Sequence, residues 1–536
     1  MSRVTQRGHS RRFLTYLPPR GTMRPSPTRR VATAAVAVLS AGALSVGFLA
    51  APAEAAADPA TRLAERLVRQ TNGGDANRHL IALQRISDRN GGNRAAPDGE
   101  SAAAPGYEAS VEYVSGQLRR AGYLVDVQDF TYPVEVELAA SITVGGTAYR
   151  IDKMNESIDT PAGGITGPIR VVPEDATTGC EATDFAGQVF TGSVALIRRG
   201  GCTFEQKSLN AAAAGAVAAV ISNNTAGPLS NVTITNTGPI PVGGISQADG
   251  TTLAAQAGAA ATVEMRYEEQ TRTSQNVIAE TRTGKRNNVV MAGAHLDAVY
   301  AGINDNGSGS AALLDVALKL GGSPNVGNRV RFAWWGAEEL GLIGSSEYVK
   351  SLTFEQQLDI ALYLNFDMVA SPNAAYFVYD GDNSDAVGAG SGPYGSAQIE
   401  KTFTDFFSDR LGIETEGTDF SGRSDYGEFI ANGIPAGGLF SGAEGIMTAA
   451  QAAKWDGTAG IAYDPCYHQE CDNLGNINRE ALDRNLDAMA WSVGLYAYST
   501  QEINGVPPRA QRLTMRSAAK NKMKLAGTYV PSDKAA

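Results

Sequence analysis

Residues 288–297, NVVMAGAHLD, form a short apolar run that ends in a histidine and an aspartate. Two later stretches have the same form, RVRFAWWGAEE at 329–339 and ALYLNFDM at 361–368. A short apolar run bounded by polar residues is typical of a buried strand. Around these runs the apolar spacing predicts helices at 308–320, 337–350, 396–411 and 478–498 and strands at 359–366 and 435–440. This alternation predicts an α/β fold, a mostly parallel mixed sheet with helices on both faces.

Polar side chains follow each of these runs. In an open α/β sheet, ligands bind beyond the carboxyl ends of the strands, so we expect these side chains to meet. They are His295, Asp297, Asp305, Glu338, Glu339 and Asp367, together with His468 in DPCYHQECD at 464–472. Two histidines with several carboxylates suit a zinc-type cation, and a shared carboxylate suits a pair of ions about 3.5–4 Å apart. Taken alone, the Glu338-Glu339 pair could instead be the acidic first turn of a helix.

The part of the chain before these strands has a different pattern of apolar residues and turns. Residues 58–130 show helical spacing of apolar residues and end in a predicted strand at 122–130. From about 133 to 266, short β-type runs alternate with Gly and Pro turns, and an alanine-rich helix is predicted at 206–219. The stretch TGSVALIRRGGCTFEQKSLNAAAAGAVAAVISN at 191–223 resembles the protease-associated (PA) domain. This resemblance implies an inserted, β-rich, non-catalytic module.

The first 57 residues predict export. They hold eight Arg and a single acid, Glu54, and an apolar run from Val31 to Ala51 follows Arg29 and Arg30. The small residues around Glu54 match the pattern that a signal peptidase cleaves. A single membrane-spanning helix is the alternative, because the run is about long enough to cross a bilayer. The alanine-rich run favours a signal peptide, and hence a secreted protein with no stable membrane anchor.

The four cysteines form two local pairs, Cys180 with Cys202 and Cys466 with Cys471. An even, paired set in an exported chain predicts disulfides. The alternative for the second pair is a zinc site, since His468 lies between the two cysteines.

Four motifs occur together in one order: HLD–x₇–DNGSG, WWGAEELGLIGS, NFDM and DPCYHQECD. This set resembles the secreted co-catalytic zinc aminopeptidases of the bacterial leucyl aminopeptidase type, and the form with a PA insertion is similar to aminopeptidase Y. The resemblance spans about residues 60–130 and 272–500. It implies a zinc peptidase domain at 58–132 and 272–500 with a PA domain inserted at 133–271. The predicted signal segment at 1–57 precedes these domains, and a basic tail at 501–536 follows them.

The resemblance also implies two zinc ions per chain. His295 and Asp367 would bind one ion. Glu339 and His468 would bind the other, and Asp305 would bridge the two.

Three further roles are implied by the same resemblance. Glu338 would be the general base and acid, moving a proton from the water to the leaving amine. Asp297 would orient the imidazole of His295. Tyr467 would stabilise the tetrahedral oxyanion, and the Cys466–Cys471 disulfide would pin its loop.

One stretch departs from the family pattern, in which Ser-Asp-His precedes a phenylalanine near the substrate pocket. Here SGRSDYGEF at 421–429 places Tyr426 after Ser424 and Asp425. Arg423 would line the substrate pocket, or it would lie in a surface turn. The family's expectation for this pocket is an apolar side chain of the substrate.

The predicted function is therefore a secreted, monomeric zinc aminopeptidase acting on peptides and proteins with a free N-terminus. Alternatives are a carboxypeptidase or dipeptidase on the same fold, a single-zinc glutaminyl cyclase, and a non-catalytic PA-domain binding protein. The net charge of −11, from 45 Lys+Arg and 56 Asp+Glu, argues against nucleic acid as a partner. Residues 505–536 are basic, and we expect either a disordered tail or a propeptide or wall-attachment segment.

Overall fold

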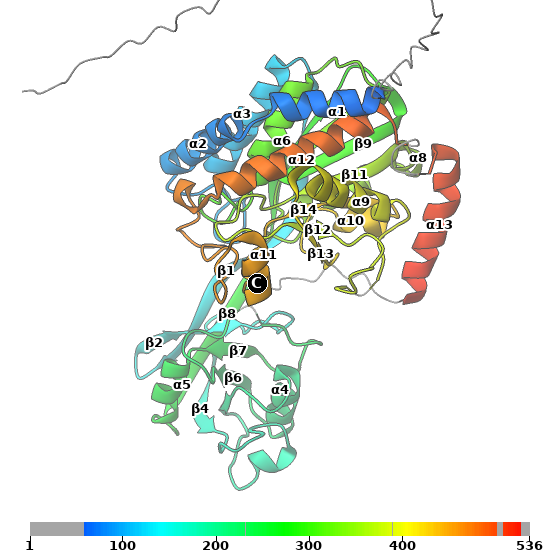
Figure 1. Cartoon of the computed structure of the whole chain (residues 1–536). Coiled ribbons are helices and arrows are strands. Elements are labelled where there is room, and N and C mark those ends of the chain that lie inside the picture. Colours follow the sequence, from blue (N-terminus) through cyan, green and yellow to red (C-terminus); the bar gives the residue numbers. More distant parts are fainter. Residues whose placement is uncertain (1–57, 231, 389, 501–506, 527–536) are drawn as a thin grey trace, which may run out of the picture. The chain divides into compact units, whose positions relative to one another are not determined.

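The computed structural model of the chain describes residues 58–230, 232–388, 390–500 and 507–526. The predicted export segment at 1–57 lies outside the described residues. Figure 1 labels the elements along the chain. The helices are α1 (Pro59–Gln70), α2 (Gly73–Arg89), α3 (Pro105–Arg120), α4 (Phe204–Ala213), α5 (Gln247–Ala254), α6 (Gly307–Leu320), α7 (Ile343–Ser351), α8 (Phe354–Asp359), α9 (Ser396–Phe406), α10 (Gly427–Ala431), α11 (Ala449–Trp455), α12 (Arg479–Tyr498) and α13 (Arg509–Ala526). The strands are β1 (Leu124–Val144), β2 (Thr147–Arg150), β3 (Asp152–Lys153), β4 (Ile165–Val171), β5 (Val194–Arg198), β6 (Ala218–Ser222), β7 (Val242–Ile245), β8 (Ala260–Glu280), β9 (Lys285–His295), β10 (Asn328–Trp335), β11 (Ile360–Phe366), β12 (Phe377–Tyr379), β13 (Glu416–Thr418) and β14 (Ala436–Phe440).

The three apolar runs of the sequence become neighbouring strands of one sheet. Its order here is β13-β12-β14-β11-β9-β10-β8. β9 pairs in parallel with both β10 and β11, and β11 pairs in parallel with β14. β8 is antiparallel to β10, and β12 is antiparallel to β14. The predicted α/β class with a mixed sheet is confirmed.

Helices cover both faces of this sheet, and β10 shows how its residues divide between them. Phe332 and Trp334 pack into the core that includes α2, α3, α6 and α12. Ala333 and Trp335 pack on the other face, with Tyr348 of α7 and residues of α10. Because both faces are buried, the strands read as continuous apolar runs and not as an alternating pattern.

The helix predicted at 337–350 is wrong in its first half, since α7 begins at Ile343. Residues Ala337 and Leu342 have left-handed backbone, with φ of 55° and 58°. The amides of Gly341 and Leu342 both donate to the carbonyl of Glu338, which closes a tight turn. The acidic pair therefore lies in a turn after β10. Its position depends on tertiary contacts that helical periodicity does not report.

The alanine-rich helix predicted at 206–219 is wrong at its end. α4 stops at Ala213, and Gly215 has a φ of 92° that a continuing helix does not allow. The following residues form β6, which pairs in parallel with β5 and β7. A short buried apolar run does not distinguish helix from strand by its periodicity.

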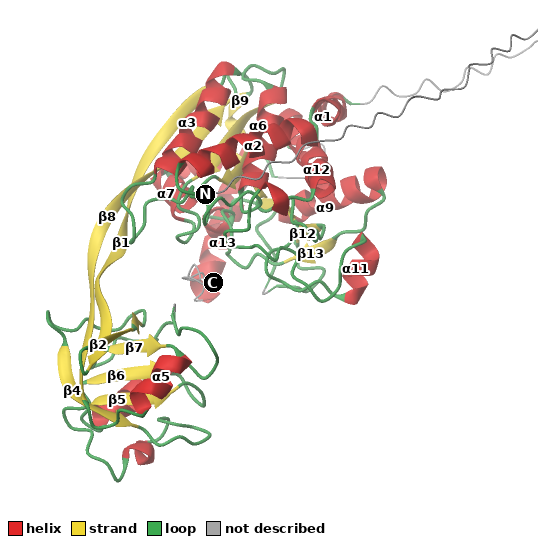
Figure 2. Ribbon diagram, turned by 90° about the vertical axis from the view of Figure 1, so that its left-hand side faces the viewer, coloured by secondary structure: helices red, strands yellow, loops and turns green. Residues whose placement is uncertain are grey.

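The predicted PA domain is confirmed as a β-rich module. β4, β5, β6 and β7 pair in parallel in that order, with α4 and α5 beside them. The long strands β1 and β8 pair antiparallel along most of their length (Figure 2). Pro133 pairs with Thr271 at the predicted domain boundaries, so both boundaries fall opposite each other on this strand pair.

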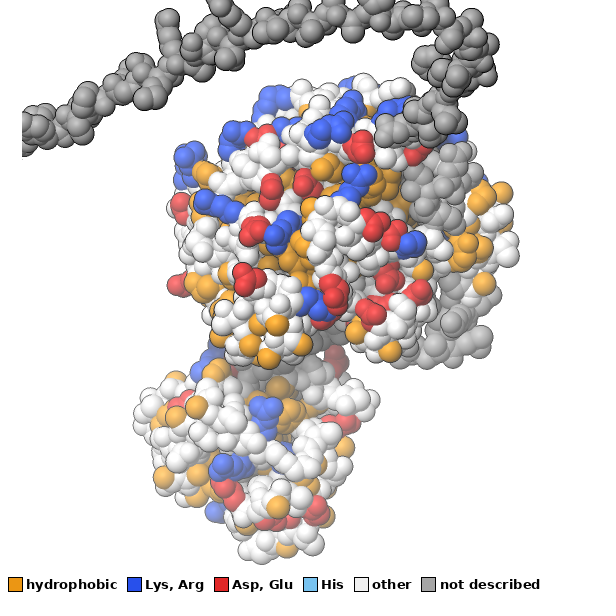
Figure 3. Space-filling view, in the orientation of Figure 1, with side chains coloured by type: hydrophobic (Ala, Val, Ile, Leu, Met, Phe, Trp, Pro, Cys, Tyr) orange, Lys and Arg blue, Asp and Glu red, His pale blue; other side chains and the backbone are white. Residues whose placement is uncertain are grey.

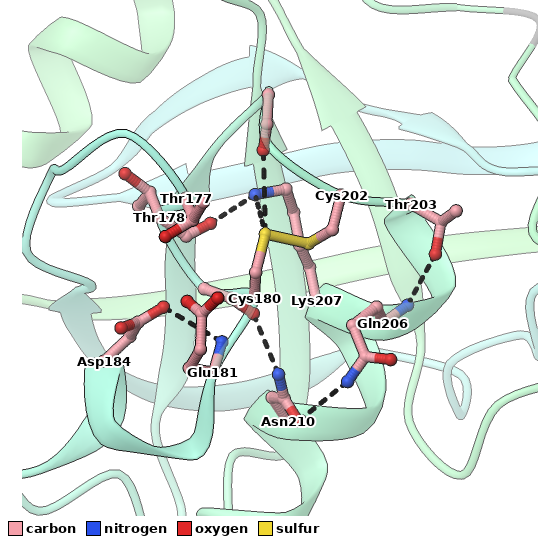
Figure 4. Close-up of a disulfide and its surroundings, with 12 residues drawn as sticks. Thr177, Thr178, Cys180, Glu181, Asp184, Cys202, Thr203, Gln206, Lys207 and Asn210 are labelled. Atoms are coloured by element: carbon pink, nitrogen blue, oxygen red, sulfur yellow. Dashed lines mark hydrogen bonds between the residues drawn. A yellow bond between two sulfur atoms is a disulfide. The ribbon is translucent and has the colours of Figure 1, made fainter.

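Both predicted disulfides are present, Cys180–Cys202 and Cys466–Cys471. Lys207 of α4 lies beside the first disulfide (Figure 4). This lysine is fully buried. Its Nζ donates to the carbonyl of Thr178 and lies 3.8 Å from Sγ of Cys180. This lysine and the disulfide together attach the loop around Cys180 to α4.

A disordered tail, one of the two predictions for 505–536, is wrong for the part that forms α13. Arg512 and Arg516 of this helix are buried and donate to the carbonyls of Leu358 and Gln357 near the end of α8. Cations at a helix C-terminus satisfy carbonyls that lack partners within the helix. No helix in the described ranges is long and apolar enough to cross a membrane. On the face drawn in Figure 3, basic and acidic side chains are interspersed.

Candidate metal centre

The structure brings the predicted ligands together at the carboxyl ends of the central strands. His295 is the last residue of β9, and Asp367 follows the last residue of β11. Glu339 lies in the turn after β10, Asp305 precedes α6, and His468 lies in the loop between α11 and α12. Parallel pairing of β9, β10 and β11 is what places these strand ends side by side.

Three carboxylates surround the Nε2 atom of His295. Oδ1 of Asp305 and Oδ1 of Asp367 each lie 3.2 Å from this nitrogen, and Oε2 of Glu338 lies 3.8 Å from it. All four residues are buried. Ligand atoms of His295, Asp305 and Asp367 lie close enough together to hold one ion.

A second group surrounds the Nε2 atom of His468. Oε2 of Glu339 lies 2.9 Å from this nitrogen, and Oδ2 of Asp305 lies 3.2 Å from it. Asp305 therefore directs Oδ1 to one histidine and Oδ2 to the other. A carboxylate shared between two ions requires this arrangement.

Asp297 supports the acidic turn as well as the first histidine. Its carboxylate accepts the backbone N–H of Glu338 at 3.1 Å and that of Glu339 at 3.3 Å. Its backbone carbonyl oxygen lies 3.1 Å from Nδ1 of His295, whereas its Oδ1 lies 3.9 Å away. The predicted contact with the imidazole therefore runs through the backbone of Asp297, and its carboxylate holds the turn.

Sequence reasoning assigned no role to two polar side chains that hold ligands. Ser424 donates its hydroxyl to Oδ2 of Asp367 at 2.7 Å and accepts from Nδ2 of Asn365 at 2.7 Å. Asp472 accepts the backbone N–H of Asp305 at 2.9 Å. Both lie in stretches that the sequence singled out, since Ser424 belongs to SGRSDYGEF and Asp472 ends DPCYHQECD. Only their burial and contacts show what they do.

A cavity of about 230 Å³ opens beside these groups. Its walls include Asp305, Glu338, Glu339, Asp367, Met368, Tyr379, Arg423, Tyr426, Phe440, Ala443 and Tyr467. Arg423 donates to the hydroxyl of Tyr467 at 3.2 Å and pairs with Oε1 of Glu444 at 2.7 Å. The ring of Tyr467 stacks on His468, with 3.8 Å between centroids. Arg423 and Tyr467 thus both belong to the wall of this cavity.

Negative charge is crowded at this centre. Burial raises the pKa of Glu338 well above its usual range and that of Glu339 to about 7. Burial also opposes ionisation of Asp305, yet hydrogen bonds from the two histidines hold its pKa below the usual range. Although burial lowers it, the pKa of His468 rises to about 10 because Asp305 and Glu339 face it. Buried carboxylates in such number need a cation, and imidazole nitrogens with carboxylate oxygens are a donor set that fits zinc.

The mixed α/β sheet and the cluster of histidines and carboxylates at its strand ends place the protein in the class of metal-dependent hydrolases. The sequence matches Peptidase family M28 over residues 276–493 and the PA domain over residues 165–253. It is 46% identical over 441 residues to a probable lipoprotein aminopeptidase of Mycobacterium tuberculosis, covering 81% of this chain and 87% of that protein. It is 44% identical over 469 residues to an aminopeptidase of Pseudomonas aeruginosa, covering 82% of this chain and 85% of that protein.

A solved structure agrees with these sequence matches. The zinc aminopeptidase of Bacillus subtilis superposes with a TM-score of 0.60 at 26% identity, over 81% of this chain and 97% of that one. The chain belongs to peptidase family M28 with a PA domain, and it is a metallo-aminopeptidase.

Proposed function

We propose that this aminopeptidase is exported, binds two zinc ions per chain, and prefers apolar N-terminal residues. The observation that carries the two-ion site is the carboxylate of Asp305, with one oxygen 3.2 Å from His295 and the other 3.2 Å from His468. In this proposal His295 and Asp367 hold one ion. Glu339 and His468 hold the other.

When bound, the two ions supply Lewis acidity that polarises the scissile carbonyl and lowers the pKa of a water molecule. Glu338 accepts the proton of that water on its carboxylate and passes it to the amine of the leaving group. Burial raises the pKa of Tyr467, so its hydroxyl stays protonated at neutral pH and donates to the developing oxyanion. Arg423 donates a hydrogen bond to this hydroxyl and so fixes its position.

The cavity wall supports the proposed preference for an apolar side chain. The wall carries an apolar or aromatic group beside the carboxylates, made by Met368, Tyr379, Tyr426, Phe440 and Ala443. An apolar pocket with a few convergent polar groups suits a substrate whose backbone binds at the polar end.

Export is supported by the basic, alanine-rich start of the sequence and by the two disulfides, which persist in oxidising compartments. We further propose that the protein acts as a monomer on peptides and proteins that have a free N-terminus.

The test uses purified mature protein with leucyl-p-nitroanilide and its N-acetyl form. We expect cleavage of the free-amine substrate alone, faster cleavage of leucyl than of glutamyl substrates, and about two zinc ions per chain by elemental analysis. Equal cleavage of the acetylated substrate would contradict the proposed specificity for a free N-terminus. Full activity with one bound zinc would contradict the two-ion mechanism.

A further inference from the structure

One fully buried arginine binds the chain segment that joins two of the proposed metal ligands. Arg94 lies in the segment between α2 and α3 and has no exposed surface. Its three guanidinium nitrogens donate to three carbonyl oxygens: Nε to Ala301 at 2.8 Å, Nη1 to Leu296 at 2.8 Å, and Nη2 to Gly302 at 2.7 Å. Its backbone N–H adds a fourth contact, to the carbonyl of Tyr300 at 2.9 Å.

All four acceptors belong to residues 296–306, which we call the ligand loop. This loop joins β9 to α6, with His295 immediately before it and Asp305 near its end. It forms no strand or helix, so its carbonyls depend on partners outside the loop. Arg94 supplies such partners at both ends of the segment from Leu296 to Gly302, and the carbonyl of Gly302 also accepts the backbone N–H of Gly307 at 3.0 Å.

The far end of the ligand loop is held by a different group. Asp472 accepts the backbone N–H of Asn304 at 2.8 Å and that of Asp305 at 2.9 Å. Arg94 thus holds the carbonyls of the loop, and Asp472 holds its amides. With the loop held by these two residues, Nε2 of His295 lies 3.2 Å from Oδ1 of Asp305.

We propose that Arg94 is a positioning residue for the metal centre: its forked guanidinium fixes the ligand loop, so that His295 and Asp305 reach the same ion. This inference rests on the proposed zinc site. A planar guanidinium can satisfy three separate carbonyls at once, which the single nitrogen of lysine cannot do in the same geometry.

The charge of Arg94 and its hydrogen bonds to the loop would have opposite effects on zinc affinity. Burial lowers its pKa to about 10, against the pull of Asp472, Asp297 and other nearby carboxylates, so it stays charged at neutral pH. A fixed positive charge near the site repels a zinc ion. If Arg94 acted by charge alone, its removal would tighten zinc binding. If it acts by fixing the loop, its removal weakens zinc binding.

Two substitutions separate these effects in the full-length mature enzyme. Arg94→Lys keeps the charge and loses the fork, and Arg94→Met loses both. Arg512→Met is the matched control, because Arg512 is also buried and also donates to backbone carbonyls, those of Leu358 and Pro507, neither of which belongs to the ligand loop. The zinc dissociation constant is measured by chelator competition well below the unfolding temperature, and the visible spectrum of the cobalt-loaded protein reports the coordination.

We expect both Arg94 variants to bind zinc at least about tenfold more weakly, with a changed cobalt spectrum, and the Arg512→Met control to match the wild type. Three results would each overturn the inference. They are a loss of zinc affinity of less than about tenfold in Arg94→Lys, a gain of zinc affinity in Arg94→Met, and a loss of zinc affinity in Arg512→Met equal to that in the Arg94 variants. If Arg94→Met does not fold, Arg94→Lys alone decides the question. Failure of the zinc site itself would show separately, as a wild type that does not bind zinc.

Discussion

The carboxylate of Asp297 accepts the backbone N–H of Glu338 at 3.1 Å. Asp297 follows β9 and Glu338 follows β10, so this bond ties two strand ends together where the reaction is proposed to occur. Because the bond goes to the backbone, it fixes the place of Glu338 and leaves its carboxylate free. The proposed general base is thus held by the same residue that contacts the first histidine.

Glu338→Gln tests the role of that carboxylate. We expect kcat to fall by roughly 10²–10⁴-fold, because glutamine cannot accept the proton, while zinc content stays unchanged. Steady-state kinetics and elemental analysis measure the two quantities. Glu347→Gln on α7, a half-exposed position paired with Lys350, is the control and should keep wild-type kinetics. A Glu338→Gln enzyme with normal kcat would remove Glu338 from the mechanism.

Asp297→Asn tests the support of the acidic turn. The amide keeps one acceptor oxygen, so one of the two N–H groups of Glu338 and Glu339 loses its partner. We expect kcat to drop by roughly 10–100-fold, with weaker zinc binding of similar size. Unchanged kinetics together with unchanged zinc affinity would show that the turn holds its shape without this carboxylate.

Tyr467→Phe removes the hydroxyl that we propose as an oxyanion donor. The aromatic ring remains, so its stacking on His468 is kept. Loss of one such donor lowers kcat by about 10²–10³-fold in comparable sites, and we expect KM to change little. A rise in KM at constant kcat would instead assign Tyr467 to ground-state binding of the substrate.

The burial of His79 leads us to expect that the protein loses stability when the pH is lowered. Burial lowers its pKa to about 4, whereas an exposed histidine titrates near 6.5. The unfolded chain therefore binds the proton first, and stability falls as the pH drops from about 6.5 towards 4. At pH 4.5 this costs roughly 2–3 kcal/mol of the free energy of unfolding.

The comparison is between wild type and His79→Gln. Thermal unfolding at pH 7.5 and pH 4.5 should show a smaller drop in Tm for the variant, since the other titrating groups are common to both proteins. An equal drop in both proteins would mean that His79 is protonated without penalty in the folded state.

The Cys180–Cys202 disulfide closes a loop with a sequence separation of 22 residues. By the chain-entropy account, its removal costs roughly 3 kcal/mol of stability. We expect the Cys180→Ser, Cys202→Ser double variant to unfold at lower temperature in calorimetry while it cleaves leucyl-p-nitroanilide at the wild-type rate. A large loss of kcat on this small substrate would show that the PA domain contributes to the catalytic site.

Several features of the protein follow from its sequence alone. Three apolar runs that each end in an acid or a histidine predict parallel strands and a shared site at their carboxyl ends, because the length and apolar character of a run are local properties of the chain. The PA domain and the family were likewise indicated by motifs in a fixed order. The start of α7 and the end of α4 were not, because left-handed turns and strand pairing there depend on partners far away in the sequence.

The sequence by itself determined the residue types of this protein's candidate centre, two histidines and a set of carboxylates, and the places of His295, Glu338, Glu339 and Asp367 after strands. The tertiary structure decided which oxygen faces which nitrogen and which groups hold the ligands in place. Ser424 forms a hydrogen bond with Asp367, and Arg94 and Asp472 form hydrogen bonds with the ligand loop. These contacts exist only because the folded chain buries the three side chains beside the groups that they bind. A buried polar group must find a partner, and that partner is chosen by three-dimensional packing, which motif spacing does not encode.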